Sequence, residues 1–187
     1  DSIVTENGRL SIGSPALFER RMRKISDDVT GFGGCMDPDS VIVSRYGVFW
    51  IDRLRKKVIA LDQSARDVTN GMQSFLNRFL TGDVVGTYDN FTDNFYWTDK
   101  GGKWTVSYKP RLGDFVSFHS FIADQYMPLP NNYLTVKDGG IWKHNKHGLY
   151  QTYYGEQAKF EIGFVIDNKF APMVLQDLEI YSEWFKP

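Results

Sequence analysis

Cysteine is nearly absent from this sequence of 187 residues, with Cys35 as the single example. One thiol excludes an internal disulfide framework and a cysteine-ligated zinc site, and it agrees with assembly in a reducing cytosol. Long apolar runs are missing as well, because none approaches the ~18 residues that a membrane-spanning helix needs. The sequence therefore predicts neither a disulfide-stapled domain nor a membrane contact.

An excess of charge of one sign is also missing. The 22 basic and 23 acidic residues give a formal net charge of -1, whereas a dedicated nucleic-acid binder normally carries a basic excess. Apolar residues make up 42% of the chain and charged residues 24%. These are ordinary values for a globular protein, so wholesale disorder is excluded.

Aromatic side chains are the residues present in excess, with 14 Phe, 10 Tyr and 5 Trp beside 17 Gly. This combination favours short strands joined by tight turns over a helix bundle. The predicted fold class is mainly β, made of antiparallel short strands and hairpins, with two short helices. The chain begins with Asp1 and not with Met, so we expect a fragment or a processed product of a longer protein.

Two helices and a first group of strands are predicted in residues 1–82, which form one candidate unit. Ser14 and Pro15 can start a helix whose apolar face extends to Ile25. Asn70 is a candidate cap for a second helix with apolar spacing over 72–80. Between the helices, apolar runs predict three antiparallel strands, at 41–43, 48–51 and 58–61.

Residues 83–187 are predicted to be an aromatic-rich antiparallel β region, continuous with the first unit or separate from it. Strands at 94–98 and 103–108 flank the turn sequence 99–102, which is typical of a hairpin. Strands at 133–136 and 141–143 flank a second such turn. Two later apolar runs, 160–166 and 173–184, are long enough to pair as strands.

Trp50, Trp97 and Trp142 form a weak internal repeat, since each lies in or beside an aromatic-rich strand next to a turn. A period of about 40–50 residues is typical of propeller blades, which are four-stranded sheets that stack on their neighbours. Hairpins in a β-sandwich recur at similar intervals. The sequence leaves both architectures open.

Catalytic motifs are weak. No phosphate-binding loop or nucleophile elbow is present, and lysines surround the candidate ligand pair His144 and His147, which disfavours a divalent cation. Carboxylates in the aromatic region could serve a glycosidase, namely Asp89, Asp93, Asp99, Glu156 and Glu161. Solvated turn carboxylates are the more common outcome, so we predict no cofactor, no metal and no catalytic residue.

A basic loop stands out against the neutral chain, with Arg53, Arg55, Lys56 and Lys57 in five residues. It is interpreted either as a solvated hairpin loop or as a patch that faces nucleic acid or an acidic subunit. These four residues, together with Tyr96, Trp97 and Trp142 in the hairpins, are the candidate contacts for assembly or for a lumen.

Several stretches resemble virion proteins of tailed bacteriophages, in particular the tail and muzzle (nozzle) proteins of crAss-like phages. The resemblance extends from about Gly13 to Phe185. The stretches that carry it are 33–40, 46–52, 70–75, 88–89, 94–97, 104–108, 115–121, 141–145 and 154–155, with the closing strands.

The resemblance implies a non-enzymatic structural part of a phage tail, taken from a propeller-bearing subunit. It implies a homo-oligomeric ring near the portal around the DNA exit path. It also implies contacts with other tail and portal proteins, transient contact with genomic DNA, and assembly in the host bacterial cytoplasm. The alternative is a carbohydrate-binding or glycan-cleaving receptor-binding module, which needs exposed aromatic side chains in a groove. A generic β-sandwich interaction domain is a third possibility.

Overall fold

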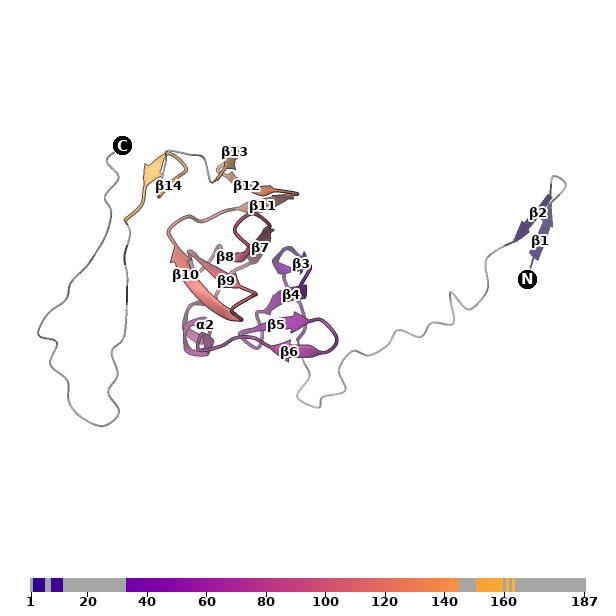
Figure 1. Ribbon diagram of the computed structural model, residues 1–187, viewed down its shortest axis with the longest axis horizontal. Coiled ribbons are helices and arrows are strands. Elements are labelled where there is room, and N and C mark those ends of the chain that lie inside the picture. The colour runs from indigo at the N-terminus through magenta and orange to yellow at the C-terminus, as the bar shows by residue number, and fades with distance from the viewer. Residues whose placement is uncertain are drawn as a thin grey trace, which may run out of the picture.

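The computed structural model describes residues 2–5, 8–11, 33–144, 151–159, 161 and 163 (Figure 1). The predicted helix over 14–25 and the run 173–184 lie outside these residues, as does the run 160–166 apart from Glu161 and Gly163. The described part is mainly β and antiparallel, as predicted. It begins with an isolated hairpin of β1 (Ser2–Thr5) and β2 (Gly8–Ser11).

The first large sheet follows a single 3-10 turn, η1 (Pro38–Ser40). Its strands pair in chain order, and they are β3 (Ile42–Ser44), β4 (Gly47–Asp52), β5 (Lys57–Leu61) and β6 (Ala65–Asp67). The three predicted strands are therefore confirmed, and β6 is a fourth that the sequence did not indicate because it is short and polar.

Helix α2 (Gln73–Phe79) confirms the second predicted helix and corrects its start. Met72 occupies the N-cap position, and no side chain caps the helix. Asn70 has a φ of 29°, and its side chain donates a hydrogen bond to the carbonyl of Gly113 on a distant loop. A tertiary contact thus uses the side chain that the local pattern had assigned to the helix.

The second and third sheets contain both predicted hairpins. The central sheet also pairs in chain order, with β7 (Val84–Asp89), β8 (Asn94–Asp99), β9 (Trp104–Lys109) and β10 (Asp114–His119). The third sheet comprises β11 (Gln125–Leu129), β12 (Asn132–Lys137) and β13 (Gly140–Lys143). A short hairpin follows, made of β14 (Thr152–Tyr153) and β15 (Glu156–Gln157).

Four of the hairpins share one loop geometry, in which four residues connect the last paired positions. The fourth loop residue has a positive φ in each case, and these residues are Lys56, Asp93, Lys103 and Gly113. Four-residue loops of this kind are built around a type I turn, and the left-handed residue returns the chain to the next strand. The same local geometry therefore recurs in the first and central sheets.

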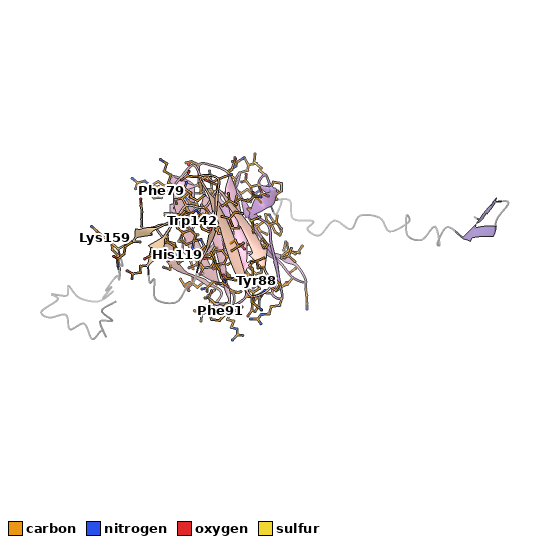
Figure 2. The ribbon with its side chains drawn as sticks, turned by 90° about the horizontal axis from the view of Figure 1, so that it is seen from above. Phe79, Tyr88, Phe91, His119, Trp142 and Lys159 are labelled. Carbon is orange, nitrogen blue, oxygen red and sulfur yellow. The ribbon has the colours of Figure 1, made fainter. Side chains whose placement is uncertain are left out.

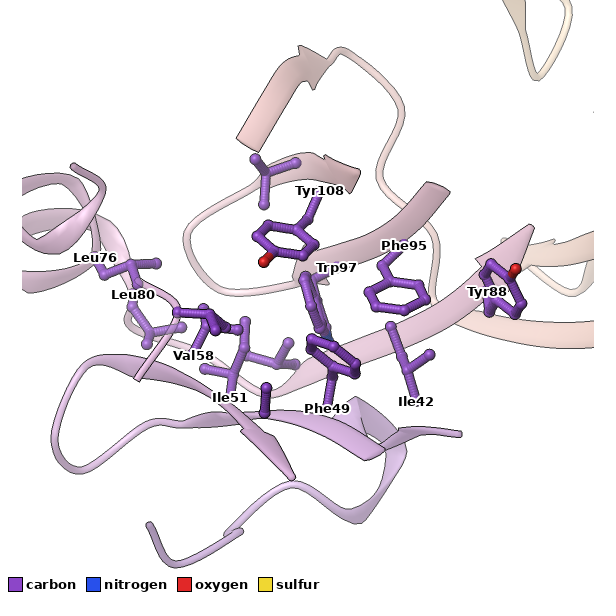
Figure 3. Close-up of a cluster of buried hydrophobic side chains, with 14 of the residues drawn as sticks. Ile42, Phe49, Ile51, Val58, Leu76, Leu80, Tyr88, Phe95, Trp97 and Tyr108 are labelled. Carbon is purple, nitrogen blue, oxygen red and sulfur yellow. The ribbon is translucent and has the colours of Figure 1, made fainter. Parts of the chain in front are cut away.

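The sheets stack in layers, and the central sheet has buried residues on both faces. Its first face and the first sheet share a core that contains Phe49, Phe95 and Trp97 (Figure 3). The ring centroids of Phe49 and Phe95 lie 4.7 Å apart. The second face packs against the third sheet through Tyr96 and Tyr133. The boundary at residue 82 therefore falls on the connection between two sheets that share one core.

The successive sheets resemble propeller blades, because each is an antiparallel meander and the first strands β3, β7 and β11 lie next to one another. Trp50 and Trp97 occupy equivalent second strands, as the repeat predicted. Trp142 does not, because it lies on the third strand of its sheet. The described residues do not close into a barrel or a ring of blades.

Candidate functional site

The four basic side chains of the loop between β4 and β5 each contact a group of the same chain. Arg53 Nη1 lies 2.8 Å from Asp83 Oδ1, and Arg55 Nη1 lies 3.1 Å from Asp52 Oδ2. Lys56 donates to the carbonyl oxygen of Leu80. In the same way Lys57 Nζ lies 2.7 Å from Asp67 Oδ2, so each predicted basic residue has a partner in its own chain.

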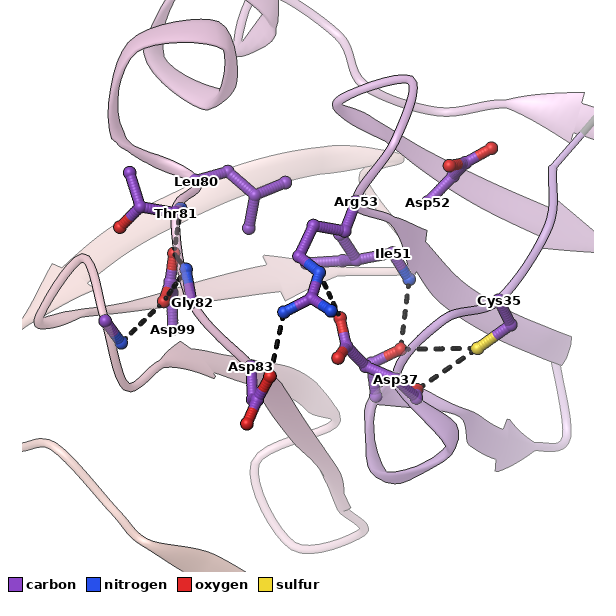
Figure 4. A network of polar contacts seen from close by, with 12 residues as sticks. Cys35, Asp37, Ile51, Asp52, Arg53, Leu80, Thr81, Gly82, Asp83 and Asp99 are labelled. Atoms are coloured by element: carbon purple, nitrogen blue, oxygen red, sulfur yellow. Dashed lines mark hydrogen bonds and ion pairs between the residues drawn. The ribbon is translucent and has the colours of Figure 1, made fainter.

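Arg53 links this loop to a polar network between the first and central sheets (Figure 4). Its Nε lies 3.5 Å from Asp37 Oδ2. Burial raises the pKa of Asp37, and the nearby Arg53 guanidinium opposes that rise. Asp99 accepts backbone hydrogen bonds from Thr81 and Gly82, at 2.7 and 3.0 Å. The network therefore joins the two sheets and is a structural feature of the monomer.

The structure places Tyr96 and Trp97 in the interior. Trp97 is fully buried, and its indole Nε1 donates to the carbonyl of Ser40 at 2.9 Å. Tyr96 is 7% exposed. Alternation along β8 directs one of these side chains to each buried face of the central sheet. A role of this hairpin in assembly stays a prediction.

Trp142 lies at the surface, 38% exposed, beside a groove of about 700 Å³ (Figure 2). Its ring meets that of Tyr154 edge-on, with centroids 5.4 Å apart. Both charge signs line the groove, at Lys100, Lys103, Lys137, Asp124, Asp138 and Glu156. An aromatic wall with polar groups of both signs suits a neutral polar ligand better than a strongly charged one.

The described histidines pack against the core between the central and third sheets, where His144 is buried and His119 is half-buried. His119 Nε2 lies 2.9 Å from Ser107 Oγ, and His144 Nε2 lies 2.6 Å from Thr135 Oγ1. Burial lowers the pKa of each to about 4. His147 lies outside the described residues, and within the described ones no group of three candidate ligands could hold a metal ion.

Two of the candidate glycosidase carboxylates serve the hairpin turns. Asp89 accepts from Phe91 N at 2.9 Å and from the Thr92 hydroxyl at 2.7 Å. Asp99 accepts from Gly101 N and Gly102 N at 2.8 and 2.9 Å. Both carboxylates are fully buried. They hold the first turn of each loop by accepting its N–H groups.

Asp93 is the centre of a cluster that the sequence did not indicate. Tyr88 and Tyr46 donate their hydroxyls to it at 2.7 and 2.8 Å. Arg45 and Arg111 approach it at 2.7 and 2.9 Å. Burial favours the neutral acid, but the donors outweigh it and lower the pKa of Asp93 to about 2. Three loops meet here, so the cluster fastens one end of the first sheet to the central sheet.

Both outer sheets expose apolar side chains away from the central sheet. On β3, Ile42 points into the core and the next residue, Val43, is 73% exposed. On the third sheet, Ile141 is 66% exposed, and Met127 and Leu129 are each 42% exposed. No helix of the described residues is both long and apolar enough to cross a bilayer.

Comparison with known families gives one finding. The family model described as crassvirus muzzle protein matches residues 6–139. These residues include the first and central sheets and most of the third. Comparison with curated proteins gives no match.

Proposed function

Because this chain belongs to the crassvirus muzzle protein family, we propose that it is a non-enzymatic subunit of a homo-oligomeric ring near the portal. The family supports a structural, tail-related role in the phage particle. In the proposed ring the subunits contact other tail and portal proteins and surround the path of the exiting DNA. Assembly takes place in the host bacterial cytoplasm.

The observation that supports a ring best is the open stack of sheets. Each outer sheet exposes an apolar residue on the side away from the central sheet, Val43 on the first and Ile141 on the third. Because the two faces differ, contact between them is head-to-tail, and head-to-tail contacts close into rings when the rotation permits. Exposed apolar patches rimmed by polar residues are typical of such interfaces.

The experiment is a measurement of mass in solution, by light scattering and native mass spectrometry, with negative-stain imaging of the particles. We expect an oligomer with rotational symmetry, and Val43→Asp or Ile141→Asp should dissociate it. Leu54→Asp is the matched control, because Leu54 is equally exposed, at 75%, but lies in the β4–β5 loop. A monomer at tens of micromolar, or equal loss with the control, would contradict the ring.

Within the basic loop, we propose Arg55 and Lys57 as the groups that face the lumen, while Arg53 and Lys56 hold the loop. The side chains of Arg55 and Lys57 are each 39% exposed. Charge-driven contact with DNA weakens steeply with salt. Transient binding at low salt that decreases in an Arg55→Ser, Lys57→Ser variant would support the contact, and binding unaffected by the two changes would remove it.

The groove beside Trp142 favours carbohydrate binding as a second candidate function. Its aromatic wall and mixed polar lining could stack against a sugar ring and hydrogen-bond to its hydroxyls. A glycan array followed by titration of Trp142→Ala tests this directly. Binding that is lost in the variant would support the candidate, and no binding across the array would reject it.

A further inference from the structure

Strand β10 forms an edge of the central sheet that no described strand pairs with. It is six residues long, with Val116 44% exposed and Phe118 55% exposed. The corresponding outer strand of the first sheet, β6, has only three residues, two of them the charged Arg66 and Asp67. Short, charged edges resist further pairing, whereas long apolar ones invite a strand. The two sheets thus differ in whether the outer edge is protected.

A groove of about 860 Å³ follows the β10 edge. Residues 116–120 line one side of it, and Ala158, Lys159, Glu161 and Gly163 line the other. Ser120 and Ala158 also line the groove beside Trp142. Ala158, just after β15, therefore lies near the end of β10 at Ser120, and a strand that started there and followed the edge would run antiparallel to β10.

The sequence that follows alternates in its large side chains, with Val165 as the one apolar residue at an intervening position. Phe160, Ile162, Phe164 and Ile166 occupy every second position of 160–166. This period of two is typical of a strand with one buried face.

We propose that residues 160–166 of the same chain add to β10 as an antiparallel fifth strand of the central sheet. Pairing satisfies the outward N–H and C=O groups of β10, as in strand addition to other exposed edges. The apolar side chains of the added strand cover Val116 and Phe118. The ring of Phe118 already packs against Phe75 of α2, with centroids 4.8 Å apart. The added strand would therefore extend outward the core that the first and central sheets share. This inference does not depend on the proposed ring.

The direct test is cross-linking of the full chain in a Cys35→Ser background, with Ser117→Cys and Glu161→Cys. A short bismaleimide should link the two thiols within one chain, giving a monomer of altered mobility. The matched control replaces Ser117→Cys by Arg66→Cys on the protected edge. In this control the reagent should not link the two thiols. A cross-linked dimer would overturn the assignment to the same chain, and a yield equal to the control would overturn the pairing itself.

Hydrogen exchange provides an independent test. Phe164→Asp should lower the protection of the β10 amides at least about tenfold, because it places a charge on the buried face of the added strand. Val165→Asp adds the same charge one residue away on the opposite face, and it should leave protection close to that of the parent. Retained near-ultraviolet circular dichroism shows that the core is intact in both variants. Equal protection in the two variants would overturn the proposal.

Discussion

The two faces of the central sheet both carry buried residues, but their chemistry differs. The face toward the first sheet meets aliphatic and aromatic side chains such as Phe49 and Ile51. The face toward the third sheet carries a hydroxyl network, in which Thr98 Oγ1 lies 2.7 Å from both Thr105 Oγ1 and Tyr126 Oη. The buried His144 and the half-buried His119 also lie against this second face. One sheet therefore combines an aliphatic and aromatic core on one face with a hydrogen-bonded core that acid can disturb on the other.

The largest expected effect is on the apolar face. Trp97→Ala removes a fully buried ring and should lower the free energy of unfolding by about 3–5 kcal/mol. Trp142→Ala, at a surface position, should cost less than about 1 kcal/mol. Urea denaturation of both variants measures the difference. Similar losses would show that Trp97 is not the core residue that its burial indicates.

Acid should act on the histidine-bearing face. The pKa of His119 and of His144 is lowered from 6.5 to about 4 in the folded chain, so between these values the unfolded chain binds more protons. Stability is therefore fully present above pH 6.5 and falls as the pH drops toward 4, by roughly 1–2 kcal/mol per histidine at pH 5.

The measurement is hydrogen exchange at pH 7 and pH 5, after correction for the intrinsic rates. We expect the third sheet to lose protection before the first sheet does. A His119→Gln, His144→Gln variant should show a flatter dependence of stability on pH, whatever its absolute stability. An unchanged slope would mean that the two imidazoles are not the groups that acid titrates.

The hydroxyl network should contribute less than the aromatic core. Tyr126→Phe preserves the ring and removes one hydroxyl, so we expect a loss of about 1 kcal/mol. Thr98 keeps its contact with Thr105 in this variant, which limits the cost. Thermal unfolding monitors the change, and a loss as large as that of Trp97→Ala would reverse the proposed ranking of the two faces.

The smallest expected effect is at the Asp93 cluster, which joins the first sheet to the central sheet from outside the core. The pKa of Asp93 is lowered from 3.8 to about 2. The stability that this carboxylate contributes is therefore present above pH 3.8 and is lost as the pH falls through about 2. Asp93→Asn should cost about 1 kcal/mol near pH 7, since the exposed Arg45 and Arg111 are screened by solvent. The difference between parent and variant, followed by urea denaturation, should vanish toward pH 2. A difference that persists there would exclude a role for the carboxylate charge.

The candidate site was only partly predictable from the sequence. The basic loop was found, because charge clustering is a local property. The partners of Arg53 and Lys57 were not, since Asp83 and Asp67 come from other turns and strands. The Asp93 cluster likewise joins loops separated by 48 residues of chain at Arg45 and Asp93. No spacing rule within one segment could have indicated it.

Strand β10 shows the same limit within a single element. A register shift between Phe115 and Ser117 marks a bulge, which places Phe115 and Phe118, three residues apart, opposite Tyr108 and Val106 on one face. Simple alternation assigns those two side chains to opposite faces. That β10 is an edge strand could likewise not be recognised before the strand order was known.

The sequence by itself determined the β character of this protein, the places where the chain turns, and its likeness to muzzle proteins. Strand propensity and turn chemistry are stored in neighbouring residues, so they can be recognised locally. Only the tertiary structure decided that Trp97 is buried and Trp142 exposed, that the basic loop is held by its own chain, and that one sheet edge is protected and the other open. These outcomes depend on how the sheets stack, and stacking brings together residues that are far apart in the chain.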